Sequence, residues 1–137
     1  MLIVSGCLAG LNCRYDGKSK TNARILKMLA EGRILPLCPE QLGGLATPRS
    51  PVDIISGADV LRGKERIIDE EGQDVTANFL HGARELLKIA RMVNPGLIIL
   101  KSRSPSCGAH GVTTALLKKQ GFKVITDEEW EELDERS

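Results

Sequence analysis

The sequence has no excess of charge of either sign. Its 19 Lys and Arg residues are balanced by 18 Asp and Glu residues, which leaves a formal net charge of +1 at pH 7. Proteins that bind nucleic acid backbones or anionic membranes rely on clustered or excess positive charge. The balance therefore argues against nucleic acid and membrane as the main partner of this protein.

Long apolar runs are also missing. No uninterrupted apolar stretch approaches the roughly 18 residues that a membrane-spanning helix needs. The opening residues, MLIVSGCLAG, are apolar but lack the basic segment of a secretory signal, so they predict a first strand. We expect a cytoplasmic protein, a monomer or a homodimer, with one domain over residues 1–137 and a core that folds without disulfides.

The four cysteines include no closely spaced pair. They are Cys7, Cys13, Cys38 and Cys107. Structural zinc sites often use Cys-x2-Cys pairs, and ferredoxin-type iron–sulfur sites use similarly close spacing. Disulfides are rare in the cytoplasm, so we expect these residues to be free thiols, metal ligands or catalytic groups.

Short apolar strands alternate with segments of helical period. The predicted strands are Leu2–Ser5, Ile34–Leu37, Leu97–Leu100 and Phe122–Ile125. The predicted helices are Lys20–Glu31, a long helix capped by Thr76 that ends at Val93, Gly111–Gln120, and a C-terminal helix opened by a capping box at Thr126 and Glu129. This alternation predicts an α/β fold, a Rossmann-like three-layer sandwich with a mostly parallel sheet. Pro36 indicates that the second strand is either an edge strand or a short one.

Two segments before the long helix show a different pattern. Pro39–Gly57 has no clear period, and a stretch of this length without regular structure is uncommon in a compact domain unless it is functional or disordered. Its several aliphatic residues argue against disorder. Asp59–Val75 predicts a small β-hairpin insertion with its turn near Glu71–Gln73.

Three cysteines follow predicted strands closely. Cys38 comes directly after the second strand, Cys7 follows the first strand after one glycine, and Cys107 lies in the loop after the third. The carboxyl ends of parallel strands share one edge of an open α/β sheet, and ligands bind there. We therefore expect the three thiols to converge. The spacing alone leaves open a three-cysteine iron–sulfur cluster with one open iron, a zinc site, a thiol catalyst, or buried thiols without chemistry.

Three longer motifs contain these cysteines. They are VSGCLAGLNCRYDG (Val4–Gly17), CPEQLGGLATPRSPVDI (Cys38–Ile54) and LKSRSPSCG (Leu100–Gly108). Together, in this order and over nearly the whole chain, they resemble the family of bacterial thiouracil desulfidases. The resemblance implies a [4Fe-4S] cluster held by Cys7, Cys38 and Cys107, and it carries no ligand role over to Cys13. One motif of the family differs in this sequence, because Asp53 stands where the family has Glu. This difference weakens the case for a functional role of Asp53.

The resemblance implies a non-redox reaction on a small thiolated nucleobase. A thiolated pyrimidine such as thiouracil would bind through its sulfur to the open iron, a soft Lewis acid, and water would replace the sulfur to give uracil and hydrogen sulfide. Glu40 is the candidate general base. Ser104 is the candidate for relaying a proton or holding the intermediate, and its alternative is a side-chain-to-backbone turn around Pro105.

Three further residues are candidates for contact with the substrate. Tyr15 alone among the few aromatic residues lies in a motif loop, where it could flank a flat ring. Arg49 could contact substrate carbonyls, or it could form an ion pair that orders a loop. Gly44, in a pair of glycines, could let the backbone approach a ligand closely.

Two other classes of protein fit the same residues. One is a sulfur carrier or transferase that uses a persulfide on Cys13 or Cys107, and it would work without iron. The other is a non-catalytic module that binds zinc or a nucleotide, and it would release no sulfide.

Overall fold

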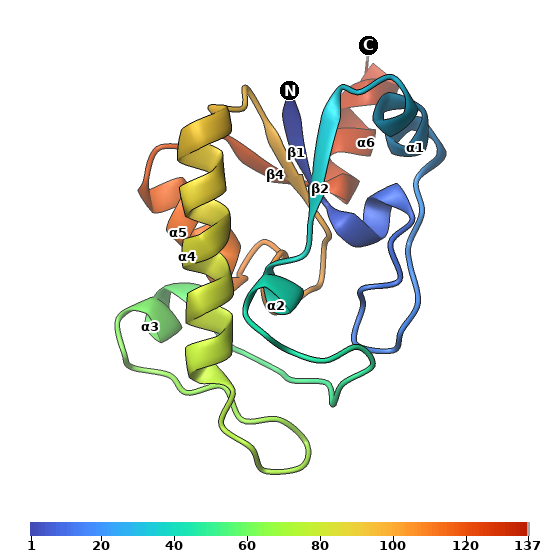
Figure 1. Ribbon diagram of the computed structural model, residues 1–137. Coiled ribbons are helices and arrows are strands. Elements are labelled where there is room, and N and C mark those ends of the chain that lie inside the picture. Colours follow the sequence, from blue (N-terminus) through green and yellow to red (C-terminus); the bar gives the residue numbers. More distant parts are fainter. Residues whose placement is uncertain (137) are drawn as a thin grey trace.

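A four-stranded, entirely parallel sheet forms the centre of the protein. The computed structural model describes residues 1–136 (Figure 1). The strands are β1 (Leu2–Ser5), β2 (Ile34–Leu37), β3 (Ile98–Leu100) and β4 (Val124–Thr126), in the order β2-β1-β3-β4. The predicted α/β fold is confirmed, and so is the edge position of β2, where Pro36 pairs with Val4 of β1.

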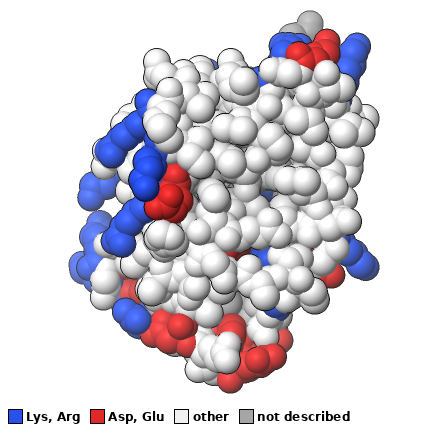
Figure 2. Space-filling view, in the orientation of Figure 1, with Lys and Arg blue, Asp and Glu red and all other residues white. Residues whose placement is uncertain are grey.

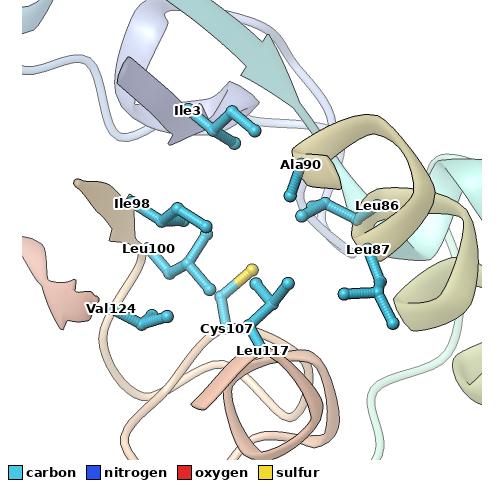
Figure 3. Close-up of a cluster of buried hydrophobic side chains, with 9 residues drawn as sticks. All are labelled: Ile3, Leu86, Leu87, Ala90, Ile98, Leu100, Cys107, Leu117 and Val124. Atoms are coloured by element: carbon cyan, nitrogen blue, oxygen red, sulfur yellow. The ribbon is translucent and has the colours of Figure 1, made fainter. Parts of the chain in front are cut away.

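Helices cover both faces of this sheet. α4 (Thr76–Val93) and α5 (Val112–Lys119) pack on one face, where their apolar residues meet those of β1, β3 and β4 (Figure 3). The short 3-10 helix η1 (Gly6–Ala9), α1 (Ala23–Ala30) and α6 (Asp127–Arg136) cover the other face. The result is the three-layer arrangement that the sequence pattern predicts, with the two groups of helices on opposite sides in Figure 1.

The hairpin predicted over Asp59–Val75 is only partly present. Its first part instead belongs to a helix, α3 (Gly57–Leu61), because the hydroxyl oxygen of Ser56 caps it by accepting the N–H of Asp59. Only isolated antiparallel bridges form, including Ile68 with Asp74, around a turn in which Gly72 adopts a positive φ. The turn prediction is therefore right and the paired strands are wrong.

The caps of two helices can be compared with the sequence signals. Thr76 does not cap α4: Val75 occupies that position, and the Thr76 hydroxyl accepts the N–H of Ile67 at 2.7 Å. The capping box that opens α6 is confirmed, since Thr126 and Glu129 exchange side-chain-to-backbone hydrogen bonds in both directions. Through this hydrogen bond Thr76 connects the loop that precedes α4 to the first turn of the helix.

Charged residues do not dominate the face shown in Figure 2. Basic side chains lie mainly along one side, acidic ones gather at the lower end, and the centre of this face is largely uncharged. Within the residues that the structure describes, no helix is both long enough and apolar enough to cross a membrane.

Candidate functional site

The carboxyl ends of three strands open onto one cavity. Its volume is about 480 Å³, and it is lined by Ser5 at the end of β1, Leu37 at the end of β2 and Lys101 just after β3. Cys7, Cys38 and Cys107 all line it. The convergence predicted from the spacing of strands and cysteines is therefore present.

Cys13 joins these three residues. Its backbone oxygen accepts a hydrogen bond from Cys38 Sγ at 3.7 Å, and it lines the same cavity as Cys7, Cys38 and Cys107. All four cysteines are free thiols, and Cys7, Cys13 and Cys107 are buried. The approach of Cys13 depends on the path of the loop after η1, which no sequence signal indicated.

The pKa values of Cys13, Cys38 and Cys107 are all raised, so these three thiols keep their protons. The hydrogen bond with Cys38 lowers the pKa of Cys13, but the contact with Cys7 and burial outweigh it and raise this pKa to about 11. The hydrogen bond to Cys13 and burial raise the pKa of Cys38. Burial raises the pKa of Cys107 to about 12, although hydrogen bonds with the hydroxyls of Ser5 and Ser104 oppose this shift. Binding of a thiophilic metal would release these protons.

The donor set fits a soft metal centre. Thiolates select iron–sulfur clusters, zinc and Cu(I) over hard cations, and the cavity presents four thiols and no imidazole. Over residues 1–136, no three His, Cys, Asp or Glu side chains are arranged to hold a metal ion. The thiols are distributed along the wall of the cavity, which has room for a group larger than one ion.

Ser104 takes part in a tight turn beside Cys107. Its hydroxyl oxygen accepts the N–H groups of Ser106 at 3.2 Å and Cys107 at 3.1 Å. The side-chain-to-backbone turn offered by the sequence is thus real. Because both acceptor positions of the hydroxyl are used, its hydrogen remains as a donor toward the cavity and the Cys107 sulfur. Ser5, which sequence reasoning missed, also lines the cavity, and its hydroxyl oxygen accepts the N–H of Lys101 at 2.8 Å.

Glu40 lies in the first turn of α2 (Pro39–Leu42), two residues after Cys38. Its side chain is 13% exposed, and one carboxylate oxygen, Oε1, accepts the Nε–H of Arg49 at 3.2 Å. Burial raises the pKa of Glu40, and Arg49 lowers it only in part. The other oxygen, Oε2, accepts no hydrogen bond from any residue of the described part of the chain.

Two glycines fix the position of α2 against α4. A Cβ at Gly82 would lie 1.9 Å from the backbone oxygen of Pro39, and a Cβ at Gly43 would lie 2.1 Å from that of Asn78. The two helix backbones therefore touch, and this contact sets the position of Cys38 and Glu40. Sequence reasoning does not single out Gly82, although an isolated glycine inside a strongly helical stretch is a known signal of close packing.

The three predicted substrate-contact residues lie in different places. Tyr15 lines the cavity with a 43% exposed side chain, and its ring contacts the guanidinium of Arg14. Arg49 also lines the cavity. Gly44 is exposed, closes the turn after α2 with a φ of +86°, and is not among the described residues that line the cavity. Lys101, Arg103 and Glu128 complete the rim.

The parallel strands end beside one cavity that is lined by thiols. This arrangement is that of an α/β protein with a thiol-lined site, suited to soft metals, at the carboxyl edge of its sheet. The chain belongs to the 2-thiouracil desulfurase family, whose model matches residues 2–129. It is 40% identical over 146 residues to the uncharacterized protein YbbK of Bacillus subtilis (strain 168), covering 94% of this chain and 97% of that protein.

A solved structure gives the same fold. The [4Fe-4S]-dependent thiouracil desulfidase TudS (DUF523Vcz) superposes with a TM-score of 0.84 at 37% sequence identity, covering 97% of this chain and 94% of that one. The family resemblance read from the three cysteine motifs is therefore confirmed.

Proposed function

We propose that this protein is a [4Fe-4S]-dependent desulfidase that hydrolyses the carbon–sulfur double bond of a thiolated pyrimidine such as thiouracil. The products are uracil and hydrogen sulfide, and water supplies the oxygen and both protons, so no electrons are exchanged. Membership of the 2-thiouracil desulfurase family and the similarity to TudS support this assignment. The observation that carries it is the convergence of Cys7, Cys38 and Cys107 on one cavity.

These three cysteines would hold the cluster, with Cys13 beside them but outside the ligand set. When bound, the cluster supplies an iron with an open position that polarises the carbon–sulfur bond as a Lewis acid. The chain supplies the remaining groups. Ser104 holds the Cys107 turn in place by accepting the N–H groups of Ser106 and Cys107, and Ser5 holds the start of the same loop by accepting the N–H of Lys101.

Glu40 is the general base in this proposal. Its raised pKa suits proton transfer near neutral pH better than that of a free carboxylate, and Oε2 is available to accept a proton from water. The oxygen of Ser104 already accepts two N–H groups, so its single hydrogen, which lies toward Cys107 and the cavity, is the candidate donor that relays a proton or holds the intermediate. Tyr15 flanks the ring, and Gly44 has no part because it lies away from the cavity.

The test begins with anaerobic purification, followed by iron and acid-labile sulfide assays and detection of sulfide released from thiouracil. We expect iron-dependent release of one sulfide per uracil formed. Cys7→Ser, Cys38→Ser and Cys107→Ser should each lose the cluster, whereas the matched control Cys13→Ser should retain it. Glu40→Gln should keep the cluster and lose roughly 10²–10⁴-fold in kcat.

Each rival has its own outcome. Equal loss of iron in all four cysteine variants contradicts the ligand assignment. Turnover without iron that depends on Cys13 or Cys107 identifies a sulfur carrier or transferase. Tightly bound zinc with no release of sulfide identifies a non-catalytic module.

A further inference from the structure

Arg49 is the most extensively bonded side chain at the cavity. It is only 8% exposed. Four of the five N–H groups of its guanidinium are used within the protein. Nε–H donates to Glu40 Oε1 at 3.2 Å, Nη1 donates to the oxygen of Ala46 at 3.2 Å and to Thr47 Oγ1 at 3.0 Å, and Nη2 donates to the oxygen of Cys13 at 2.9 Å. One Nη2 hydrogen is left for any other partner.

These bonds connect three segments of the chain. The backbone N–H of Arg49 also donates to the oxygen of Tyr15 at 2.8 Å. The residue therefore joins the Cys13–Tyr15 segment, its own loop and the first turn of α2. An arginine that only bound substrate would keep two neighbouring N–H groups of its guanidinium free, because arginine recognises carboxylate and carbonyl groups through two such parallel donors.

The pair of Glu40 and Arg49 lies between two cavities. A second cavity of about 300 Å³, on the side of Leu45 and Phe79, is also lined by both residues. Glu40 therefore separates the two cavities, and its side chain is 13% exposed. Across residues 1–136, Arg49 is the only side chain that hydrogen-bonds to it, so Arg49 determines where its two oxygens lie.

We propose that Arg49 is a positioning residue that acts through Glu40 and does not bind the substrate. It holds Oε1 by a charge-assisted hydrogen bond and leaves Oε2 as the proton-accepting oxygen. Its hydrogen bonds to the oxygens of Cys13 and Thr47 keep the guanidinium from turning toward a bound substrate. This inference rests on the proposed function, in which Glu40 is the general base.

A double-mutant cycle on the cluster-loaded enzyme tests the proposal. Arg49→Lys keeps the positive charge but loses the planar set of guanidinium donors. We expect kcat for thiouracil to fall by about 10- to 100-fold, with KM changed by less than about threefold. In the Glu40→Gln background the same substitution should change the residual kcat by less than about threefold, because its effect passes through the carboxylate. The Kd of uracil, measured by calorimetry, should change by less than about threefold in Arg49→Lys.

Thr47→Val provides a second, milder variant. It removes one acceptor of Arg49 and retains the arginine, so it should lower kcat in the same direction by a smaller factor, again only when Glu40 is present. Four results would each overturn the positioning role. They are an equal fall in kcat with and without Glu40, an effect of Arg49→Lys on KM alone, weaker binding of uracil, and loss of iron from Arg49→Lys. A Glu40→Gln enzyme with the wild-type kcat would instead overturn the base assignment in the proposed function.

Discussion

Replacing Gly82 by alanine should displace the helix that carries Glu40. Gly82 lies in the middle of α4 and faces the first residue of α2, with the added Cβ only 1.9 Å from the backbone oxygen of Pro39. Ordinary contacts of a Cβ begin at 3.4 Å, so about 1.5 Å of separation is missing. The obstructing atom belongs to backbone, and no change of side-chain rotamer can relieve the contact.

The magnitude follows from two opposing effects. Alanine in a helix interior is favoured over glycine by about 1 kcal/mol. Forcing an extra methyl group into a closely packed contact costs typically 1–3 kcal/mol, and the clash here involves two backbones. We expect the free energy of unfolding of Gly82→Ala to fall by about 1–2 kcal/mol. Because α2 must move, Glu40 should leave its place, and kcat should fall by as much as about 100-fold.

Urea unfolding of the cluster-free protein measures the first effect, and iron content with kcat measures the second. Gly96→Ala is the matched control, since nothing lies within 4 Å of a Cβ there and Gly96 has no positive φ. It should be neutral or slightly more stable than the wild type. A Gly82→Ala protein with wild-type stability and wild-type kcat would refute the claim that the contact between α2 and α4 sets the position of the site.

Three further substitutions test other parts of the fold. Asn22→Ala removes a side chain that accepts two backbone N–H groups in the first turn of α1, and it should lower the free energy of unfolding by about 1 kcal/mol in urea. Hydrogen bonds with Thr76 lower the pKa of Asp74 from 3.8 to about 2, so this carboxylate stabilises the fold above about pH 4 and its contribution is lost as the pH falls toward 2. Asp74→Asn should therefore unfold at lower urea than the wild type at pH 7, with the two midpoints converging near pH 2; a constant difference across this range would contradict the assignment. Ser5→Ala leaves the partly buried N–H of Lys101 without its acceptor and should cost about 1 kcal/mol in the same assay, whereas an unchanged midpoint would show that water or another group replaces the hydroxyl.

The convergence of the thiols could be predicted because it depends on local patterns. One short apolar strand ends directly before Cys38, another ends one residue before Cys7, and a third ends at the start of the loop that contains Cys107. Helical segments between the strands require parallel pairing, and parallel strands bring their carboxyl ends to one edge. The long helix from Thr76 to Val93 was equally clear, because its apolar stripe continues over five turns.

Other features depend on contacts between distant segments and left no local pattern. α2 has four residues, too few to show a helical period, and α3 has five. Cys13 lies in a loop that is held near the other thiols by a distant residue. Its backbone oxygen accepts a hydrogen bond from Arg49, which lies 36 positions further along the chain. The glycine pair that includes Gly44 predicts a close approach of a ligand, whereas the close neighbour of its first member, Gly43, is the backbone of α4.

The position of Pro36 in the outermost strand limits how two copies of this chain can associate. Proline lacks an N–H, and within sheets it is tolerated where that side of the strand faces solvent. β2 has only four residues, so its free edge is short and is missing a donor near its middle. A second chain could not extend the sheet there with a full set of backbone hydrogen bonds, and this exposed edge is thereby protected against strand addition and aggregation.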